Sequence, residues 1–260
     1  MHPTLNIAIK AARSAGNIIV RSMDQINTLS VSTKGRNDFV SEVDKAAEKE
    51  IIKTIRRAFP SHGILAEESG SHEGDEFLWI IDPLDGTTNF LHSFPQFSVS
   101  IALQHKGRLE HGVVYDPLRQ EIFSASRGAG AQLNDRRIRV SKASGIEGSL
   151  LGTGFPYGKM NNLNNYMEIL KHIIPQAAGV RRPGSAALDL AYVAAGRLDG
   201  FWEYSLKPWD MAAGAIIVQE AGGILSDFEG GSDYMESGDI VAGNSKVMKE
   251  LLQAINRCTK

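Results

Sequence analysis

The sequence predicts a mixed α/β protein, and three patterns in it favour that fold class. In several segments the apolar residues recur at intervals of three and four, which places them on one face of a helix. In others, apolar residues alternate singly with small or polar ones, which is the period of a strand. Segments of these two kinds follow one another through the second half of the chain, as they do in α/β proteins.

The first half is expected to hold two helices and then an antiparallel meander. Residues 4–21 have an apolar stripe of helical period, and a second helix is expected from a capping-type pattern at Ser41 to a stop at Pro60. Residues 77–81 are a short apolar run, which predicts a buried strand that ends at Asp82. Further strands are expected at residues 97–104, 111–115 and 121–125.

The second half is expected to alternate helices with short strands. Helices are predicted at residues 161–176, 185–195, 210–221 and 245–256. Strands are predicted at residues 178–181, 200–203, 224–227 and 239–242. We interpret residues 1–260 as one domain, with an α+β half up to about residue 140 and an α/β half from about residue 141.

The composition narrows the classes of function. The chain has 260 residues and a formal net charge of -2, which does not favour a general nucleic-acid-binding protein. The single cysteine, Cys258, excludes a disulfide within the chain and suits a reducing compartment. The 7 histidines show no metal-ligand spacing, which argues against a zinc site. Because no signal-peptide pattern and no long apolar run is present, we expect a cytoplasmic protein without a membrane partner.

Acidic residues cluster in the segment that carries the chemistry. Asp82 and Asp85 follow the predicted strand, and Pro83 between them cannot donate a ladder hydrogen bond. We therefore expect a tight turn that brings both carboxylates and the carbonyl oxygen of Leu84 to one side. Three hard oxygen atoms in one place are what Mg²⁺ prefers.

Two further acidic segments, at Glu67 and at Asp210, are expected to join this turn. Taken singly, such residues have ordinary structural explanations as turns, helix caps or solvated surface groups. If they converge, each pair of carboxylates about 4 Å apart repels by about 4 kcal/mol at an effective dielectric constant near 20. Protons or divalent cations must offset this repulsion, and two Mg²⁺ ions would balance four carboxylates.

Gly86, Thr87 and Thr88 follow the acidic turn and are expected to begin a short helix. The first backbone N–H groups of a helix have no partner within it. Such amides beside cations form a phosphate site, and Gly86 allows the backbone to approach a ligand closely. The sequence therefore predicts a metal-dependent site for a phosphorylated substrate.

Residues 79–90, which read WIIDPLDGTTNF, resemble the signature of the inositol monophosphatase family. Other motifs of that family are matched by EES at residues 67–69, PWDMAAG at residues 208–214 and EAGG at residues 220–223. Residues 1–3 and 181–200 look like the bacterial SuhB-type branch of the family. The resemblance extends from the region of Lys34 to the final helix, so it covers nearly the whole chain.

This resemblance implies a layered α-β-α-β-α fold, a homodimer, and dependence on two or three Mg²⁺ ions per subunit with inhibition by Li⁺. The implied ligands of the first metal are Glu67, Asp82 and the carbonyl oxygen of Leu84. Those of the second metal are Asp82, Asp85 and Asp210. Asp82, which would hold both metals, is therefore a predicted catalytic residue.

The resemblance also implies the substrate contacts. Glu67 and the Thr87 hydroxyl would orient the attacking water, while the Gly86 and Thr87 amides would bind phosphate. Lys34 and Asp44 would lie near a weaker third metal, and Asp44 also fits a plain helix-capping role. The implied contacts on the polyol side are Asp85, Arg181, Gly184, Ser185, Ala186, Glu203 and Asp210.

We therefore interpret the chain as a Mg²⁺-dependent phosphatase of inositol monophosphate or a related small polyol phosphate. Three alternatives stay open. A haloacid-dehalogenase-type phosphatase also uses an Asp-rich string, but with one residue rather than two between its aspartates. A phosphatase of sugar bisphosphates or phosphonucleotides would have the same metal site. The SuhB-type branch also implies binding to RNA polymerase antitermination factors during ribosomal RNA transcription, independently of catalysis.

Overall fold

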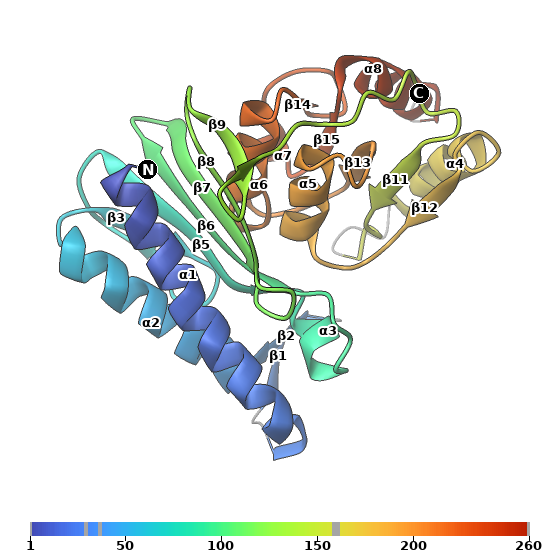
Figure 1. Cartoon of the computed structure of the whole chain (residues 1–260). Coiled ribbons are helices and arrows are strands. Elements are labelled where there is room, and N and C mark those ends of the chain that lie inside the picture. Colours follow the sequence, from blue (N-terminus) through green and yellow to red (C-terminus); the bar gives the residue numbers. More distant parts are fainter. Residues whose placement is uncertain (1, 29–30, 36–37, 158–161, 259–260) are drawn as a thin grey trace.

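The computed structural model of the chain describes residues 2–28, 31–35, 38–157 and 162–258. Helices and two sheets alternate in it as stacked layers (Figure 1). The α-helices are α1 (Pro3–Ser22), α2 (Glu42–Ala58), α3 (Thr87–Leu91), α4 (Leu163–Ile173), α5 (Ala186–Ala194), α6 (Pro208–Glu220), α7 (Tyr234–Ser237) and α8 (Ser245–Cys258).

The strands form one eight-stranded sheet, one five-stranded sheet and one hairpin. The eight-stranded sheet has the order β10-β9-β8-β7-β6-β5-β3-β4, and the five-stranded sheet has the order β12-β11-β13-β15-β14. The strands are β1 (Val31–Gly35), β2 (Asp38–Ser41), β3 (Gly63–Ala66), β4 (Gly70–His72), β5 (Phe77–Asp85), β6 (Ser98–His105), β7 (Arg108–Asp116), β8 (Glu121–Ser126), β9 (Gly130–Leu133), β10 (Arg136–Arg137), β11 (Leu150–Thr153), β12 (Gly179–Arg181), β13 (Gly200–Glu203), β14 (Ile224–Ser226) and β15 (Ile240–Gly243).

Three apolar cores hold five layers together. The first core lies between α1, α2 and one face of the eight-stranded sheet. The second joins the opposite face of that sheet to α5 and α6, which also pack against the five-stranded sheet. The third lies between the five-stranded sheet and helices α4 and α8 (Figure 1). This order of layers confirms the predicted α-β-α-β-α fold.

Helix α2 begins at the capping pattern that the sequence predicted. Ser41 Oγ accepts a hydrogen bond from the Val43 amide at 3.2 Å, and Asp44 Oδ2 accepts one from the Ser41 amide at 2.9 Å. This reciprocal pair satisfies amides that have no partner within the helix. Basic residues in the last turn of α2 complement the helix dipole.

Strand β5 differs from the prediction because it does not end at Asp82. Its pairing with β6 shifts in register between Asp82 and Asp85, and the strand continues past this bulge to Asp85. Pro83 lacks the N–H group for the ladder, so pairing is interrupted there rather than ended. The amide of Leu84 instead donates to Asp82 Oδ1 at 2.9 Å, which makes the local turn.

Several strands were not predicted, above all β3 and β11. Strand β3 has four residues and runs parallel to β5, so the first half is not a purely antiparallel meander. Strand β11 also has four residues, and only its first two, Leu150 and Leu151, are large and apolar. The predicted helix 210–221 begins two residues earlier, at Pro208, and residue 161 of the predicted helix 161–176 lies outside the described residues.

Among the described residues, no helix combines the length and the apolar character that crossing a bilayer demands.

Candidate active site

One cavity of about 530 Å³ brings together the acidic residues that the sequence singled out. It opens where the ends of β3 and β5 meet the first turns of α3 and α6. Its lining consists of Glu67, Asp82, Leu84, Asp85, Gly86, Thr87, Thr88, Asn89, His92, Tyr157, Arg182, Gly184 and Asp210.

Three elements that are distant in the chain bring the four carboxylates into this cavity. Strands β3 and β5 run parallel, with Ala66 beside Ile81, so Glu67 and Asp82 follow at the same edge of the sheet. Asp210 is the third residue of α6, which packs against β5 and β6. The unpredicted parallel pairing of β3 with β5 is therefore what places Glu67 in the cavity.

The carboxyl groups raise the pKa of one another. Burial, followed by the charges of Glu67 and Asp85, raises the pKa of Asp82 well above its ordinary value. Burial raises the pKa of Asp85 to about 6, and burial together with the charge of Asp85 raises the pKa of Asp210 to about 8. A group of acids in this situation favours protons or cations near neutral pH.

The chemistry of these donors fits Mg²⁺. Carboxylate and carbonyl oxygens are the hard ligands that this ion takes, and their mutual repulsion gives it a binding advantage. No three His, Cys, Asp or Glu side chains in the described parts of the chain already form a complete metal cage. Asp85 and Asp210 each accept a hydrogen bond from a backbone amide.

Gly86 turns the chain from β5 into α3. Its φ of 97° lies in the left-handed region that favours glycine, and a Cβ atom there would come within 3.0 Å of the Gln96 carbonyl oxygen. Thr87 Oγ1 lies 2.7 Å from Asp44 Oδ1 and 3.0 Å from the Leu84 carbonyl oxygen. The Thr87 hydroxyl hydrogen is thus directed to the protein, which leaves its lone pairs to accept from a ligand.

Asp44 and Lys34 are the two residues that the resemblance places near a weaker third metal. Asp44 is fully buried at the start of α2, where it caps the helix and accepts the hydrogen bond of Thr87. It therefore lies one side chain away from the cavity and does not line it. Lys34 belongs to β1, and its side chain lies outside the described part of the structure.

Helix α5 begins against Asp85. Ser185 Oγ donates to Asp85 Oδ2 at 2.5 Å, and the Ala187 amide donates to the same oxygen at 2.9 Å. Gly184 lines the cavity with a φ of 91°. Ser185 and Ala186 do not line it, because Ser185 lies behind Asp85 and both residues are buried.

Arg182 lines the cavity, whereas the predicted contact Arg181 does not. Arg181 is exposed, and its guanidinium group donates to the Val180 carbonyl oxygen at 3.2 Å. The Arg182 guanidinium lies over the rings of Phe155 and Tyr157, at 5.4 and 5.3 Å from their centroids. Neighbouring side chains of an extended segment point to opposite sides, so Arg182 rather than the predicted Arg181 faces the cavity.

Glu203, the last residue of β13, lies beside the cavity without lining it. Burial raises its pKa to about 8; the charge of Arg182 opposes the rise, and that of Asp210 adds to it. Its carboxylate packs against the backbone of Gly154, since a Cβ atom on Gly154 would lie 1.8 Å from Glu203 Oε1.

Other lining residues had no role in the sequence-based prediction. Asn89 lies within the resembling signature, and its Nδ2 donates to the carbonyl oxygens of Gln96 and Pro183 at 2.7 and 2.8 Å. It thereby ties α3 to the segment before α5. His92 and Tyr157 also line the cavity, and no motif or spacing in the sequence points to either of them.

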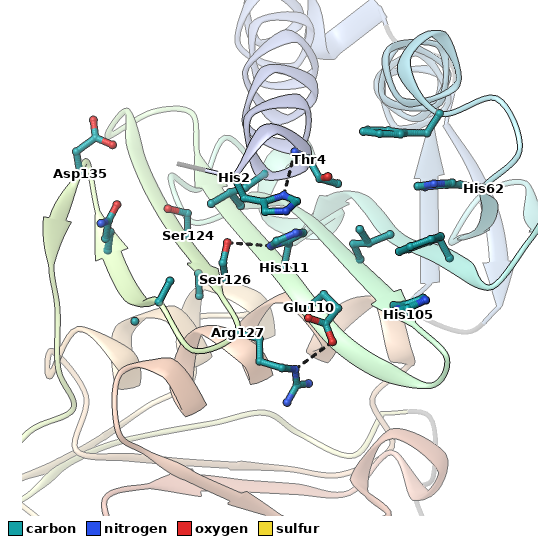
Figure 2. Close-up of a pocket in the computed structure, with 18 residues that line it drawn as sticks. His2, Thr4, His62, His105, Glu110, His111, Ser124, Ser126, Arg127 and Asp135 are labelled. Atoms are coloured by element: carbon teal, nitrogen blue, oxygen red, sulfur yellow. Dashed lines mark hydrogen bonds and ion pairs between the residues drawn. The ribbon is translucent and has the colours of Figure 1, made fainter.

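A larger groove, of about 900 Å³, lies along the eight-stranded sheet beside the start of α1 (Figure 2). Its polar groups are largely engaged with one another. His111 Nδ1 lies 2.8 Å from Ser126 Oγ, and Glu110 pairs with Arg127 at 3.2 Å. Among the described residues that line this groove there is no cluster of acids that raise the pKa of one another. We therefore take the smaller cavity as the candidate active site.

The chain is similar to known proteins over its full length. Residues 1–260 match the profile of the inositol monophosphatase family. Nus factor SuhB of Pseudomonas aeruginosa is 57% identical over 261 residues, covering 98% of this chain and 96% of the relative. The extragenic suppressor protein SuhB of Bartonella henselae has a TM-score of 0.96 and 45% identity over 98% of this chain and 99% of its own. For inositol monophosphatase from Anabaena (Nostoc) sp. PCC 7120 the TM-score is 0.87 and the identity 42%, over 97% and 95% of the two chains.

Proposed function

Because the chain belongs to the inositol monophosphatase family, we propose that it is a Mg²⁺-dependent phosphatase of a small polyol phosphate such as inositol monophosphate. One observation carries this proposal. Four acidic side chains from three distant segments line one cavity together with the start of α3, and at least three of them have raised pKa values. A buried acidic group of this kind fits divalent cations and a phosphate ester far better than a purely structural role.

The reaction explains why a metal is part of the proposal. Phosphate monoesters are among the slowest compounds to hydrolyse, with enhancements of up to about 10²¹ required, whereas general base catalysis supplies roughly 10²–10⁴. When bound, Mg²⁺ would supply activation of water and charge stabilisation at the ester oxygens. The proposed ligands of two such ions are Glu67, Asp82, the Leu84 carbonyl oxygen, Asp85 and Asp210.

The chain's own residues would orient the reactants. The Thr87 hydroxyl, fixed by Asp44, accepts a hydrogen bond from the attacking water, and Glu67 accepts the second. The amides of Gly86 and Thr87 would bind the phosphate oxygens. On the polyol side, Glu203 would accept from a hydroxyl group, and Gly184 would allow the ring to approach the backbone.

The test of this proposal is phosphate release by the purified chain from inositol 1-phosphate. We expect turnover with Mg²⁺, none with a chelator, and inhibition by Li⁺. Sugar bisphosphates and phosphonucleotides in the same assay decide between the substrates that share this site. Turnover that persists in the chelator, or a trapped aspartyl phosphate, would contradict the proposal.

The similarity to a protein named Nus factor favours a second proposed role, as a binding partner of RNA polymerase antitermination factors in the cytoplasm. Copurification with those factors tests it, with Asp82→Asn beside the wild type. Equal binding by both proteins would separate this role from catalysis. If neither protein copurifies with these factors, the binding role is refuted and only the proposed phosphatase function remains. The proposed homodimer is tested by light scattering of the purified chain.

A further inference from the structure

The carboxyl group of Asp189 is buried and forms no hydrogen bond with the part of the chain that the structure describes. Its relative exposure is 1%, and neither Oδ1 nor Oδ2 has a hydrogen-bond partner among the described residues. An ionised carboxylate in such surroundings loses its hydration without compensation, so a group of this kind takes up a proton instead. The neutral acid has one O–H donor, and that donor is available for an acceptor nearby.

The helix that carries Asp189 begins at the candidate active site. Asp189 lies one helical turn after Ser185, on the same face of α5, and Ser185 is bonded to Asp85. Glu203 approaches from β13, on the same face of its strand as Phe201, which packs in the core shared with α5. The two carboxyl groups therefore belong to the same layer, between α5 and the five-stranded sheet.

Two glycines of the neighbouring segment lie against this layer. A Cβ atom on Gly154 would overlap the Glu203 carboxyl group, and one on Gly152 would clash with Leu198 and lie in ordinary contact, at 3.9 Å, with Asp189 Cβ. Residues 152 and 154 point to the same side of β11 and its extension. The Gly154 position therefore leaves the space that the Glu203 carboxyl group occupies, and Gly152 places the same segment beside Asp189.

The charges around Asp189 favour its neutral form. Burial raises the pKa of Asp189 well above its ordinary value, followed by the charges of Glu203 and Asp85, and only Arg182 opposes them. The Arg182 guanidinium is held over two aromatic rings at the rim of the cavity. Glu203 shares this layer with Asp189 and is also the first of the charges that raise its pKa, so it is the candidate acceptor for such a proton.

We propose that Asp189 is a positioning residue: as a neutral acid it donates a hydrogen bond toward Glu203, directly or through one water, and so orients the Glu203 carboxyl group to accept a hydrogen bond from a substrate hydroxyl. The inference rests on the proposed polyol phosphatase function. It assigns α5 a task besides packing, and it explains why an acid stands where the core around it consists of leucine, alanine and valine.

The first test separates ring hydroxyls from the phosphate ester. Kinetics with Mg²⁺ would use inositol 1-phosphate and cyclohexyl phosphate, which share a six-membered ring but differ in hydroxyl groups. For Asp189→Leu we expect KM for inositol 1-phosphate to rise about 10- to 100-fold, the effect of one lost hydrogen bond to a charged group. KM for cyclohexyl phosphate stays unchanged. Asp189→Asn keeps a donor, so it stays within a few-fold of the wild type on both substrates.

A double-mutant cycle asks whether Asp189 acts through Glu203. If it does, Asp189→Leu adds little to the KM increase that Glu203→Gln causes alone. Equal effects on both substrates, additive effects in the cycle, or a loss in Asp189→Asn as large as in Asp189→Leu would overturn the proposal.

A readout without substrate keeps this inference separate from the proposed function. The infrared difference spectrum of wild type minus Asp189→Asn, recorded at neutral pH with Mg²⁺, should show the band of a protonated carboxylic acid. A carboxylate band in its place overturns the positioning role, whatever the activity. If the wild type hydrolyses neither phosphate ester while the acid band is present, the proposed function fails and the protonation of Asp189 stands.

Discussion

Within the cavity, hydrogen bonds decide how strongly each buried acid resists ionisation. Asp85 and Asp210 lie in the same cavity, yet the pKa of Asp85 rises only to about 6 and that of Asp210 to about 8. Asp85 accepts from Ser185 and from the amide of Ala187, whereas Asp210 accepts from the amide of Lys207. Hydrogen-bond donors stabilise the charged form, so the carboxylate that accepts more hydrogen bonds ionises at the lower pH.

Replacing Asp82 by Asn should abolish turnover and leave the fold intact. The change removes one charge from the shared ligand position, so we expect activity to fall by more than about 10³-fold, at or beyond the range for one electrostatic group in a pre-organised site. Mg²⁺ should also no longer raise the melting temperature as it does for a protein that binds it. Asp135→Asn removes the same charge at an exposed position and should change neither property. Wild-type activity in Asp82→Asn would refute the assignment.

The pKa values also predict how stability depends on pH in the presence of a chelator. Asp85 and Asp210 have folded pKa values of about 6 and about 8, above the value of about 4 for an unfolded carboxyl group. The folded state holds these protons more tightly, so their contribution is complete below pH about 4 and is lost as pH rises through 6 and 8. In chelator, chemical denaturation from pH 4 to 8 should therefore show a free energy of unfolding that falls with pH. Added Mg²⁺ should remove this fall. Over the same pH range, the free energy of unfolding of Asp82→Asn should fall less than that of the wild type. A slope as steep as that of the wild type would contradict the explanation.

At the scale of secondary-structure elements, the bulge in β5 and the short helix α3 together present the site. The bulge brings Asp82 and Asp85 to the same cavity although they are three residues apart, and Gly86 then reverses the chain. The carbonyl oxygens of Gln96 and Gly184 approach Gly86 so closely that only a glycine fits there without displacement. The geometry of this turn therefore depends on contacts from outside it.

Gly86→Ala should destabilise the protein and impair activity together. A left-handed backbone costs a non-glycine residue about 1–2 kcal/mol, and the Cβ atom would also lie 3.0 and 3.1 Å from two carbonyl oxygens. Gly107→Ala is the matched control, because its φ is 80° and no heavy atom lies within 4 Å of the added Cβ. We expect the free energy of unfolding to fall more in Gly86→Ala, by about 1 kcal/mol, with loss of activity in that variant alone. Equal behaviour of the two variants would show that the close approach is unimportant.

At the scale of the whole molecule, the separation of the layers sets the position of the site. Helix α6 carries Asp210 into the cavity and lies against the eight-stranded sheet at Gly112 of β7. A Cβ atom at Gly112 would lie 2.7 Å from the Ala213 carbonyl oxygen and 2.5 Å from Ile216 Cγ2. The absence of a side chain at this glycine thus allows α6 to lie close to the sheet.

Gly112→Ala should push α6 away from the sheet and weaken both folding and Mg²⁺ binding. Overpacking of this kind costs about 1–3 kcal/mol, and the obstructing backbone oxygen cannot move without the helix. Gly16→Ala offers a control, since its Cβ atom would meet the Tyr115 ring rather than backbone, and alanine favours a helix over glycine by about 1 kcal/mol. Denaturation and Mg²⁺ titration of both variants check this, and a larger loss in Gly16→Ala would contradict it.

Patterns that lie within a few residues of each other could be predicted from the sequence. The period of α1, the capping pair at Ser41 and Asp44, and the glycine before α3 all depend on neighbours along the chain. Strand β3 was missed, and its parallel pairing with β5 is set by distant parts of the chain rather than by a local pattern. The choice of Arg182 over Arg181 likewise depends on which side of the chain faces the cavity.

The sequence alone determined the local elements, the type of donor groups and the family, because each of these is encoded in short patterns and side-chain chemistry. The tertiary structure decided which carboxyl groups share one cavity, how far their pKa values rise, and that Asp189 is buried without a hydrogen-bond partner among the described residues. The physical reason is that burial, mutual repulsion and the approach of layers depend on distances between segments. Those distances arise only when the five layers have packed.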